Sequence, residues 1–122
     1  MPNILIADDE EMIRELVQVT LSRDPLLEIR TATNGREALE AARLLRPDLL
    51  ILDVRMPGMN GLEVCRTLRD ENGAGFILML TAMGQASDVQ AGKTAGADDY
   101  FIKPFSPADL LKRVYEVLES AA

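Results

Sequence analysis

Short apolar runs alternate along this chain with stretches in which apolar residues recur every three to four positions. The runs have the length and composition of buried parallel strands, and the periodic stretches are typical of amphipathic helices. The predicted strands are Asn3–Ala7, Leu27–Thr31, Asp48–Asp53, Gly75–Leu80 and Asp98–Ile102. The predicted helices are Glu10–Ser22, Asn34 to about Arg46, Asn60 to about Asp70, Ser87–Ala95 and a last helix that starts at Ser106.

Polar capping residues mark where three of these helices begin. Asn34 and Asn60 each precede a glutamate by three positions, and Ser106 precedes Pro107 and Asp109. Five strand–helix units in this order predict one α/β domain over residues 1–122 with a doubly wound, five-stranded parallel sheet. The expected strand order is 2-1-3-4-5, the flavodoxin-like arrangement.

Carboxylates close the first and third predicted strands. Asp8 and Asp9 follow the first strand, and Asp53 ends the third. In the expected order these strands are neighbours, so the three side chains converge at the carboxyl edge of the sheet. Carboxylates that close cannot all stay ionised without help, and a divalent cation with oxygen ligands supplies it. The pattern therefore predicts a metal site, with Mg²⁺ as the favoured ion.

Two more strand ends add polar groups to the same edge. Thr81 follows the fourth strand, and Lys103 follows the fifth. This set suits phosphoryl transfer to a carboxylate, because such catalysis is mostly positioning and charge neutralisation. Asp53, which is central, would be the nucleophile, while Thr81 and Lys103 would contact phosphoryl oxygens.

Composition narrows the function further. The chain carries 13 basic and 20 acidic residues, a net charge of −7, and no basic stripe, which argues against direct nucleic-acid binding. It has no histidine, which excludes Ser-His-Asp chemistry and a phosphohistidine of its own. Its single cysteine, Cys65, is expected in the core. With no membrane span and no secretory signal visible, we expect a cytoplasmic protein without a membrane partner.

Other interpretations stay open at this point. Each polar residue could be structural: an acidic pair complements a helix dipole, and an aspartate can start a turn. Ser87–Thr94 nearly fits a phosphate-binding loop, but it begins with serine and lies in a predicted helix. A phosphatase of the haloacid dehalogenase type would need an aspartate where Arg55 stands. In a flavodoxin-like electron carrier, three acids would repel the flavin phosphate.

Four segments together resemble the response-regulator receiver domain of two-component signalling, including its chemotaxis-regulator form. They are Asp8-Asp9, Leu52–Gly61, Leu80–Ala82 and Gly96–Phe105, and the resemblance covers the whole chain. It implies that Asp53 accepts a phosphoryl group from a sensor histidine kinase or a histidine phosphotransfer protein. It also implies Mg²⁺ bound by Asp9, Asp53 and the backbone carbonyl of Arg55, with Asp8 acting partly through water.

The resemblance implies a signalling switch rather than an enzyme that turns over substrate. In the family the hydroxyl of the residue at Thr81 moves toward the phosphoryl group, and the aromatic at Tyr100 turns inward. The helix Ser87–Ala95, the fifth strand and the last helix would form the output surface for a downstream protein or an output domain. Both a free-standing regulator and part of a longer one fit the sequence. The peptide bond before Pro104 is cis in the family.

Arg55 and Met83 stand two residues after Asp53 and Thr81, at positions similar to those that tune phosphoryl lifetime in the family. Arg55 could pair with phosphoryl oxygens or exclude attacking water, or it could be only an exposed charge. We expect slow self-dephosphorylation. An unchanged acyl-phosphate lifetime in Arg55→Ala would contradict that expectation.

Overall fold

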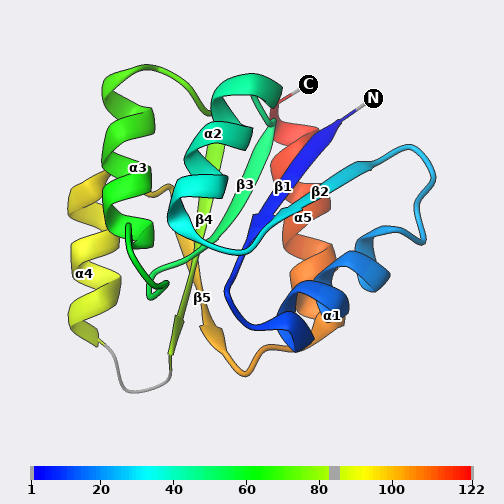
Figure 1. Ribbon diagram of the computed structural model, residues 1–122. Helices are drawn as coiled ribbons and strands as arrows, with labels where there is room; N and C mark the ends of the chain where they lie inside the picture. The colour runs from blue at the N-terminus through cyan, green and yellow to red at the C-terminus, as the bar shows by residue number, and fades with distance from the viewer. Residues whose placement is uncertain (1, 83–85, 122) are drawn as a thin grey trace.

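Five parallel strands form the sheet in the order β2-β1-β3-β4-β5 in a computed structural model that describes residues 2–82 and 86–121 (Figure 1). The strands are β1 (Asn3–Ala7), β2 (Glu28–Ala32), β3 (Leu49–Asp53), β4 (Phe76–Ala82) and β5 (Asp99–Lys103). The helices are α1 (Glu11–Leu21), α2 (Gly35–Leu45), α3 (Gly61–Asp70), α4 (Ala86–Ala95) and α5 (Pro107–Ala121). The predicted fold class and strand order are confirmed.

Element ends differ from the prediction by one or two residues, for reasons of pairing and capping. The backbone of Glu10 is extended, and this residue is the N-cap of α1 rather than its first residue. β4 continues through Thr81 to Ala82 because these residues pair with Ile102 and Lys103 of β5. Lys103 therefore lies within the fifth strand, where backbone pairing fixes the origin of its side chain.

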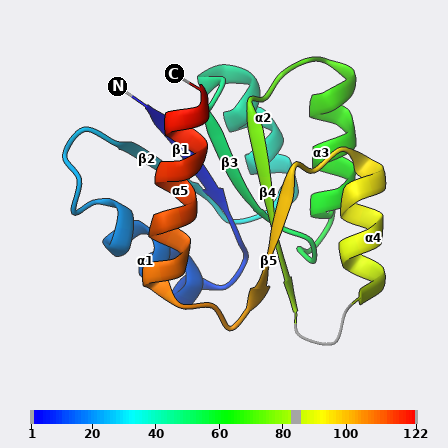
Figure 2. The same cartoon turned by 180° about the vertical axis from the view of Figure 1, so that it is seen from behind.

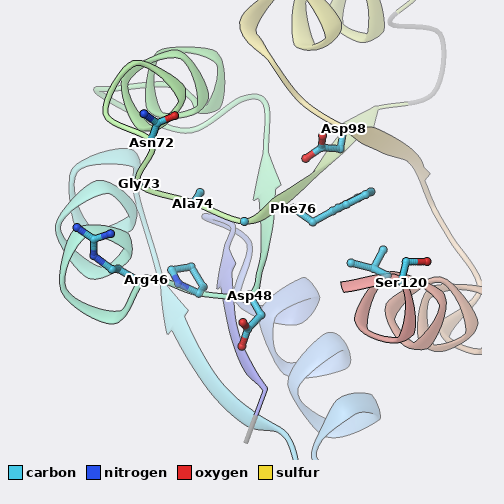
Figure 3. Close-up of a pocket in the computed structure, with 11 residues that line it drawn as sticks. Arg46, Asp48, Asn72, Gly73, Ala74, Phe76, Asp98 and Ser120 are labelled. Atoms are coloured by element: carbon cyan, nitrogen blue, oxygen red, sulfur yellow. The ribbon is translucent and has the colours of Figure 1, made fainter. Parts of the chain in front are cut away.

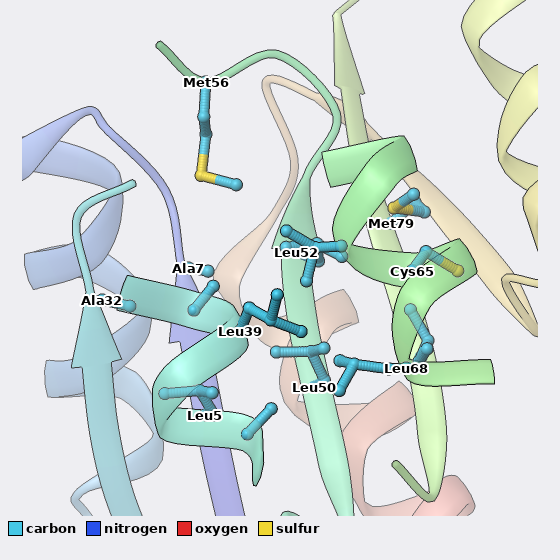
Figure 4. Packing of buried hydrophobic residues seen from close by; sticks show 14 of the residues in the cluster. Leu5, Ala7, Ala32, Leu39, Leu50, Leu52, Met56, Cys65, Leu68 and Met79 are labelled. Carbon is cyan, nitrogen blue, oxygen red and sulfur yellow. The ribbon is translucent and has the colours of Figure 1, made fainter. Parts of the chain in front are cut away.

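Helices cover both faces of the sheet. α2, α3 and α4 lie on one face (Figure 1), and α1 and α5 lie on the other (Figure 2). Neighbouring residues of the central strands serve opposite faces: Leu5 and Leu50 pack with α2 and α3 (Figure 4), whereas Ile4 and Leu49 pack with α1 and α5. Burial on both faces explains why these strands are apolar throughout.

Cys65 belongs to the cluster beneath α3 and is fully buried. Burial raises the pKa of its thiol to about 11, so it stays protonated at neutral pH. The residue behaves as a small core side chain, as the sequence predicted.

Among the described residues, no helix is long and apolar enough to cross a membrane.

α4 is held to the sheet by few large side chains. Its buried residues are Asp88, Gly92 and Ala95, and none of them is a large aliphatic residue. Helices with so little apolar contact are the first to open locally. Among the described residues, α4 therefore packs on the sheet with little apolar contact.

Replacing Gly92 with alanine should stabilise the chain. A Cβ at this position would lie 3.5 Å from Met79 Cγ, an ordinary contact, and glycine inside a helix costs about 0.5–1 kcal/mol relative to alanine. Chemical unfolding should show a gain of that size, with slower amide exchange in α4. Gly61→Ala is the matched control and should destabilise, because its Cβ would lie 2.1 Å from the Asp53 carbonyl oxygen. Equal or lower stability in Gly92→Ala would contradict this packing.

Candidate functional site

Four acidic side chains meet at the carboxyl ends of β1 and β3. Asp8, Asp9, Glu10 and Asp53 offer carboxylate oxygens that all lie within 4.8 Å of one another. Asp53 ends β3, and the backbone N–H of Asp8 donates to the carbonyl of Ala32 at 3.2 Å, which extends the pairing with β2. The structure thus brings the three predicted carboxylates together. It adds Glu10, which the run of four acidic residues after β1 could have indicated.

Lys103 joins this cluster from β5. Its Nζ lies 2.9 Å from Asp8 Oδ2, 3.0 Å from Glu10 Oε1 and 3.4 Å from Asp53 Oδ2. Burial by itself lowers the pKa of Lys103, but the carboxylates of Asp8, Asp53 and Glu10 outweigh it and the pKa is raised. The ammonium therefore stays charged. The following peptide bond to Pro104 is cis, as the resemblance implied.

The surroundings of Asp53 disfavour the ionised form of its carboxyl group. It is 5% exposed, and burial together with the negative charge of Asp8 raises its pKa to about 7, although Lys103 and the N–H of Arg55 act in the other direction. One ammonium therefore does not balance the cluster.

The cluster fits a hard cation with oxygen ligands. Asp8 Oδ2 is buried and, among the described residues, makes no hydrogen bond of acceptable geometry, although Lys103 lies within ion-pair distance. A divalent ion would use this lone pair and neutralise the excess charge. The position of the Arg55 carbonyl as a further ligand stays a prediction.

Thr81 and Tyr100 lie on the neighbouring strands. Thr81 is buried, and its hydroxyl donates to the carbonyl of Phe101 at 3.5 Å, the long limit for such a bond. Tyr100 is half-buried and packs on the face covered by α4. The Nζ of Lys93 lies 5.5 Å from the centre of its ring.

Arg55 contacts the site through its backbone and α4 through its side chain. Its N–H donates to Asp53 Oδ1 at 3.3 Å. Its guanidinium donates to both carboxylate oxygens of Asp88, at 2.9 and 3.1 Å. Sequence reasoning missed this partner, because nothing in the sequence pairs these two positions. Met83, the other predicted tuning residue, lies outside the described residues.

A hollow also lies at the opposite end of the sheet. It has a volume of about 550 Å³ and is lined by residues at the starts of β3, β4 and β5, among them Asp48, Phe76 and Asp98 (Figure 3). Its two acids serve the fold: Asp48 accepts from the N–H of Asn3 and Asp98 from that of Ile77, each at 2.8 Å. The acidic cluster is therefore the better candidate for the functional site.

Comparison with known proteins decides the family. The family model described as the response regulator receiver domain matches residues 4–115. The chain belongs to this family. Receiver domains are the signalling domains of response regulators in two-component systems.

Two similar full-length regulators support the assignment. The receiver domain is 45% identical over 111 residues to the DNA-binding response regulator MtrA of Mycobacterium tuberculosis, covering 91% of this chain and 48% of MtrA. It is also 45% identical over 115 residues to the alkaline phosphatase synthesis transcriptional regulatory protein PhoP of Bacillus subtilis. This match covers 94% of this chain and 48% of PhoP. The chain thus spans about half the length of these relatives. MtrA is named for DNA binding, so the expectation of no direct nucleic-acid contact does not extend to full-length relatives.

Solved structures show the same fold over the whole domain. The receiver domain of the Francisella response regulator 1452 matches with a TM-score of 0.90 and 27% identity, covering 100% of both chains. The chemotaxis response regulator CheY4 of Vibrio cholerae matches with a TM-score of 0.86 and 40% identity, covering 96% of this chain and 98% of that one.

Proposed function

We propose that this receiver domain accepts a phosphoryl group on Asp53 in a Mg²⁺-dependent reaction and transmits the change to α4, β5 and α5. The observation that carries the proposal is a buried carboxylate set between three other acids and one ammonium. Lys103 is positioned to stay close to a group added at Asp53, since its Nζ is 3.4 Å from Asp53 Oδ2. The chain itself has no histidine, so the phosphohistidine donor is a sensor histidine kinase or a phosphotransfer protein.

Asp8, Asp9 and Asp53 would hold the Mg²⁺ ion, with the Arg55 carbonyl and with Glu10 near enough to contribute. When bound, the ion supplies positive charge that offsets the charge of the phosphoryl oxygens. The excess of carboxylates supports this assignment, as does Asp8 Oδ2, which makes no hydrogen bond of acceptable geometry among the described residues.

In the transfer step, an oxygen of the Asp53 carboxylate attacks the phosphorus of the phosphohistidine. The P–N bond breaks as the P–O bond forms, and the imidazole keeps the electron pair. Asp53 must be ionised to attack. Its pKa of about 7 in the metal-free chain means that added positive charge favours the reactive form. Lys103 and Thr81 then contact phosphoryl oxygens.

The switch begins at Thr81. Its bond to the Phe101 carbonyl is long, and a charged phosphoryl oxygen is a stronger acceptor. Movement of this hydroxyl changes the space beside Tyr100, which packs toward the weakly held α4. The surface of α4, β5 and α5 then acts on a downstream protein or an output domain. Exposure of Ile102 on β5 supports an interface there.

We infer that the phosphodonor docks on α1. Met12, Leu16 and Val19 are exposed apolar residues on one side of this helix, which begins directly after the acidic cluster. Met12→Glu should slow transfer from a phosphorylated histidine kinase and leave labelling by a small acyl phosphate unchanged. Equal slowing with both donors would contradict docking at this helix.

Intact-mass spectrometry tests the proposed function. Incubation with a small acyl phosphate should add one phosphoryl group to the chain, and only with Mg²⁺ present. Asp53→Asn should abolish the gain, whereas Asp109→Asn, an exposed acid in the first turn of α5, should not. No adduct on the unmodified chain, or a persistent adduct in Asp53→Asn, would overturn the proposal.

A further inference from the structure

An ion pair joins the site to α4 independently of Thr81 and Tyr100. Arg55 follows Asp53 by two residues, and its guanidinium is bidentate on Asp88. The Asp88 side chain is only 10% exposed, whereas that of Arg55 is 66% exposed. Since the other buried residues of α4 are Gly92 and Ala95, this ion pair is a substantial part of how the helix is held.

We propose that Asp88 is a positioning residue that competes with a phosphoryl group on Asp53 for the guanidinium of Arg55. The inference rests on the proposed function, because the competing anion is that phosphoryl group. In the unphosphorylated chain the guanidinium is held against α4. A phosphoryl group close to the Arg55 backbone offers a second bidentate acceptor, with more charge than a carboxylate.

Competition follows from the placement of the two side chains. The Arg55 side chain is largely exposed, and its backbone N–H is 3.3 Å from Asp53 Oδ1, so a phosphoryl group on Asp53 would lie beside this residue. The Asp88 carboxylate is buried in the first turn of α4 and stays with that helix. When the guanidinium leaves, Asp88 keeps a charge that must be rehydrated or paired again, and the first turn of α4 must move for that. Phosphorylation would thus loosen α4 through Arg55 as well.

The same competition sets the lifetime of the phosphoryl group. In its loss, a water oxygen attacks the phosphorus and the P–O bond to Asp53 breaks. Asp53 recovers its carboxylate, and inorganic phosphate leaves with the oxygen of the water, whose protons pass to phosphate and solvent. Arg55 lying over the phosphoryl oxygens occupies the space through which that water approaches. Asp88 draws the guanidinium away and so shortens the lifetime.

A double-mutant cycle tests the proposal. Chains carrying Asp88→Asn, Arg55→Ala or both are phosphorylated with a small acyl phosphate and Mg²⁺, the donor is removed, and loss of the adduct is followed by intact mass. Asp88→Asn should slow the loss about two- to fivefold, the size of effect that a partly exposed ion pair has on an equilibrium. In the Arg55→Ala background the same substitution should change nothing. Asp109→Asn, in the first turn of α5, is the matched control and should leave the rate unchanged.

The outcomes separate this inference from the proposed function. A rate that Asp88→Asn leaves unchanged or increases overturns the inference alone. Slowing of equal size in the Arg55→Ala background also overturns it, because the effect then does not pass through the guanidinium. If the unmodified chain gains no phosphoryl group, both the proposed function and the inference fail.

Discussion

Replacing Lys103 with methionine should lower the free energy of unfolding of the metal-free chain by about 3 kcal/mol, the cost typical of removing one partner from a buried ion pair. The ammonium lies within 3.4 Å of Asp8, Glu10 and Asp53, and its side chain is only 14% exposed. Without it, two buried carboxylates are left to repel each other. Urea unfolding near pH 8 with a metal chelator measures the loss.

The charge state of Lys103 sets the pH range of this experiment. The raised pKa of Lys103 means that its stabilising charge is fully present below its ordinary value of 10.5, so the whole range near neutrality reports the effect. Mg²⁺ should restore part of the stability, because it supplies positive charge to the same carboxylates. Lys112→Met, which removes an exposed lysine of α5, is the matched control. A loss no larger than in that control would contradict the proposed electrostatics.

Replacing Asp53 with asparagine should stabilise the metal-free chain, by an amount that grows with pH. The folded-state pKa of about 7 lies above the ordinary value of 3.8. Between these values the folded chain binds more protons than the unfolded chain, so its stability falls as pH rises through this window. Asparagine does not titrate and escapes the penalty. The gain should reach roughly 2–4 kcal/mol near pH 8 and be smaller near pH 5.

Unfolding curves at several pH values, with and without Mg²⁺, measure this effect. Saturating Mg²⁺ should reduce or reverse the gain, since the ion favours the ionised Asp53 that asparagine lacks. Asp70→Asn, an exposed aspartate at the end of α3, should show no comparable pH-dependent gain. A gain in Asp53→Asn that is the same near pH 5 and near pH 8 would contradict a raised pKa of the buried Asp53 carboxyl group.

Much of this arrangement could be predicted because parallel strands impose it. Apolar runs gave the strands, and the strand order alone required Asp8, Asp53 and Lys103 to meet at one edge. Exact strand ends depended on pairing. Lys103 belongs to β5 because Ala82 continues β4 beside it, and no local signal marks that continuation.

Side-chain partners across loops could not be predicted in the same way. The ion pair of Arg55 and Asp88 joins the loop after β3 to a helix 33 residues further along the chain. It depends on the path of that loop and on one arginine rotamer, which no sequence period constrains. Glu10 could have been predicted as part of the site, since it continues the acidic run after Asp8 and Asp9. As the N-cap of α1, it also had an ordinary structural interpretation.

The central claim is that Asp53 is the modified residue, and chemical trapping tests it most directly. After incubation with a small acyl phosphate, borohydride reduces an aspartyl phosphate to homoserine, and peptide mass spectrometry identifies the converted position. We predict conversion at Asp53, dependent on Mg²⁺ during the incubation. Conversion at another aspartate such as Asp8 or Asp9, or conversion at Asp53 that does not need Mg²⁺, would contradict the proposed site.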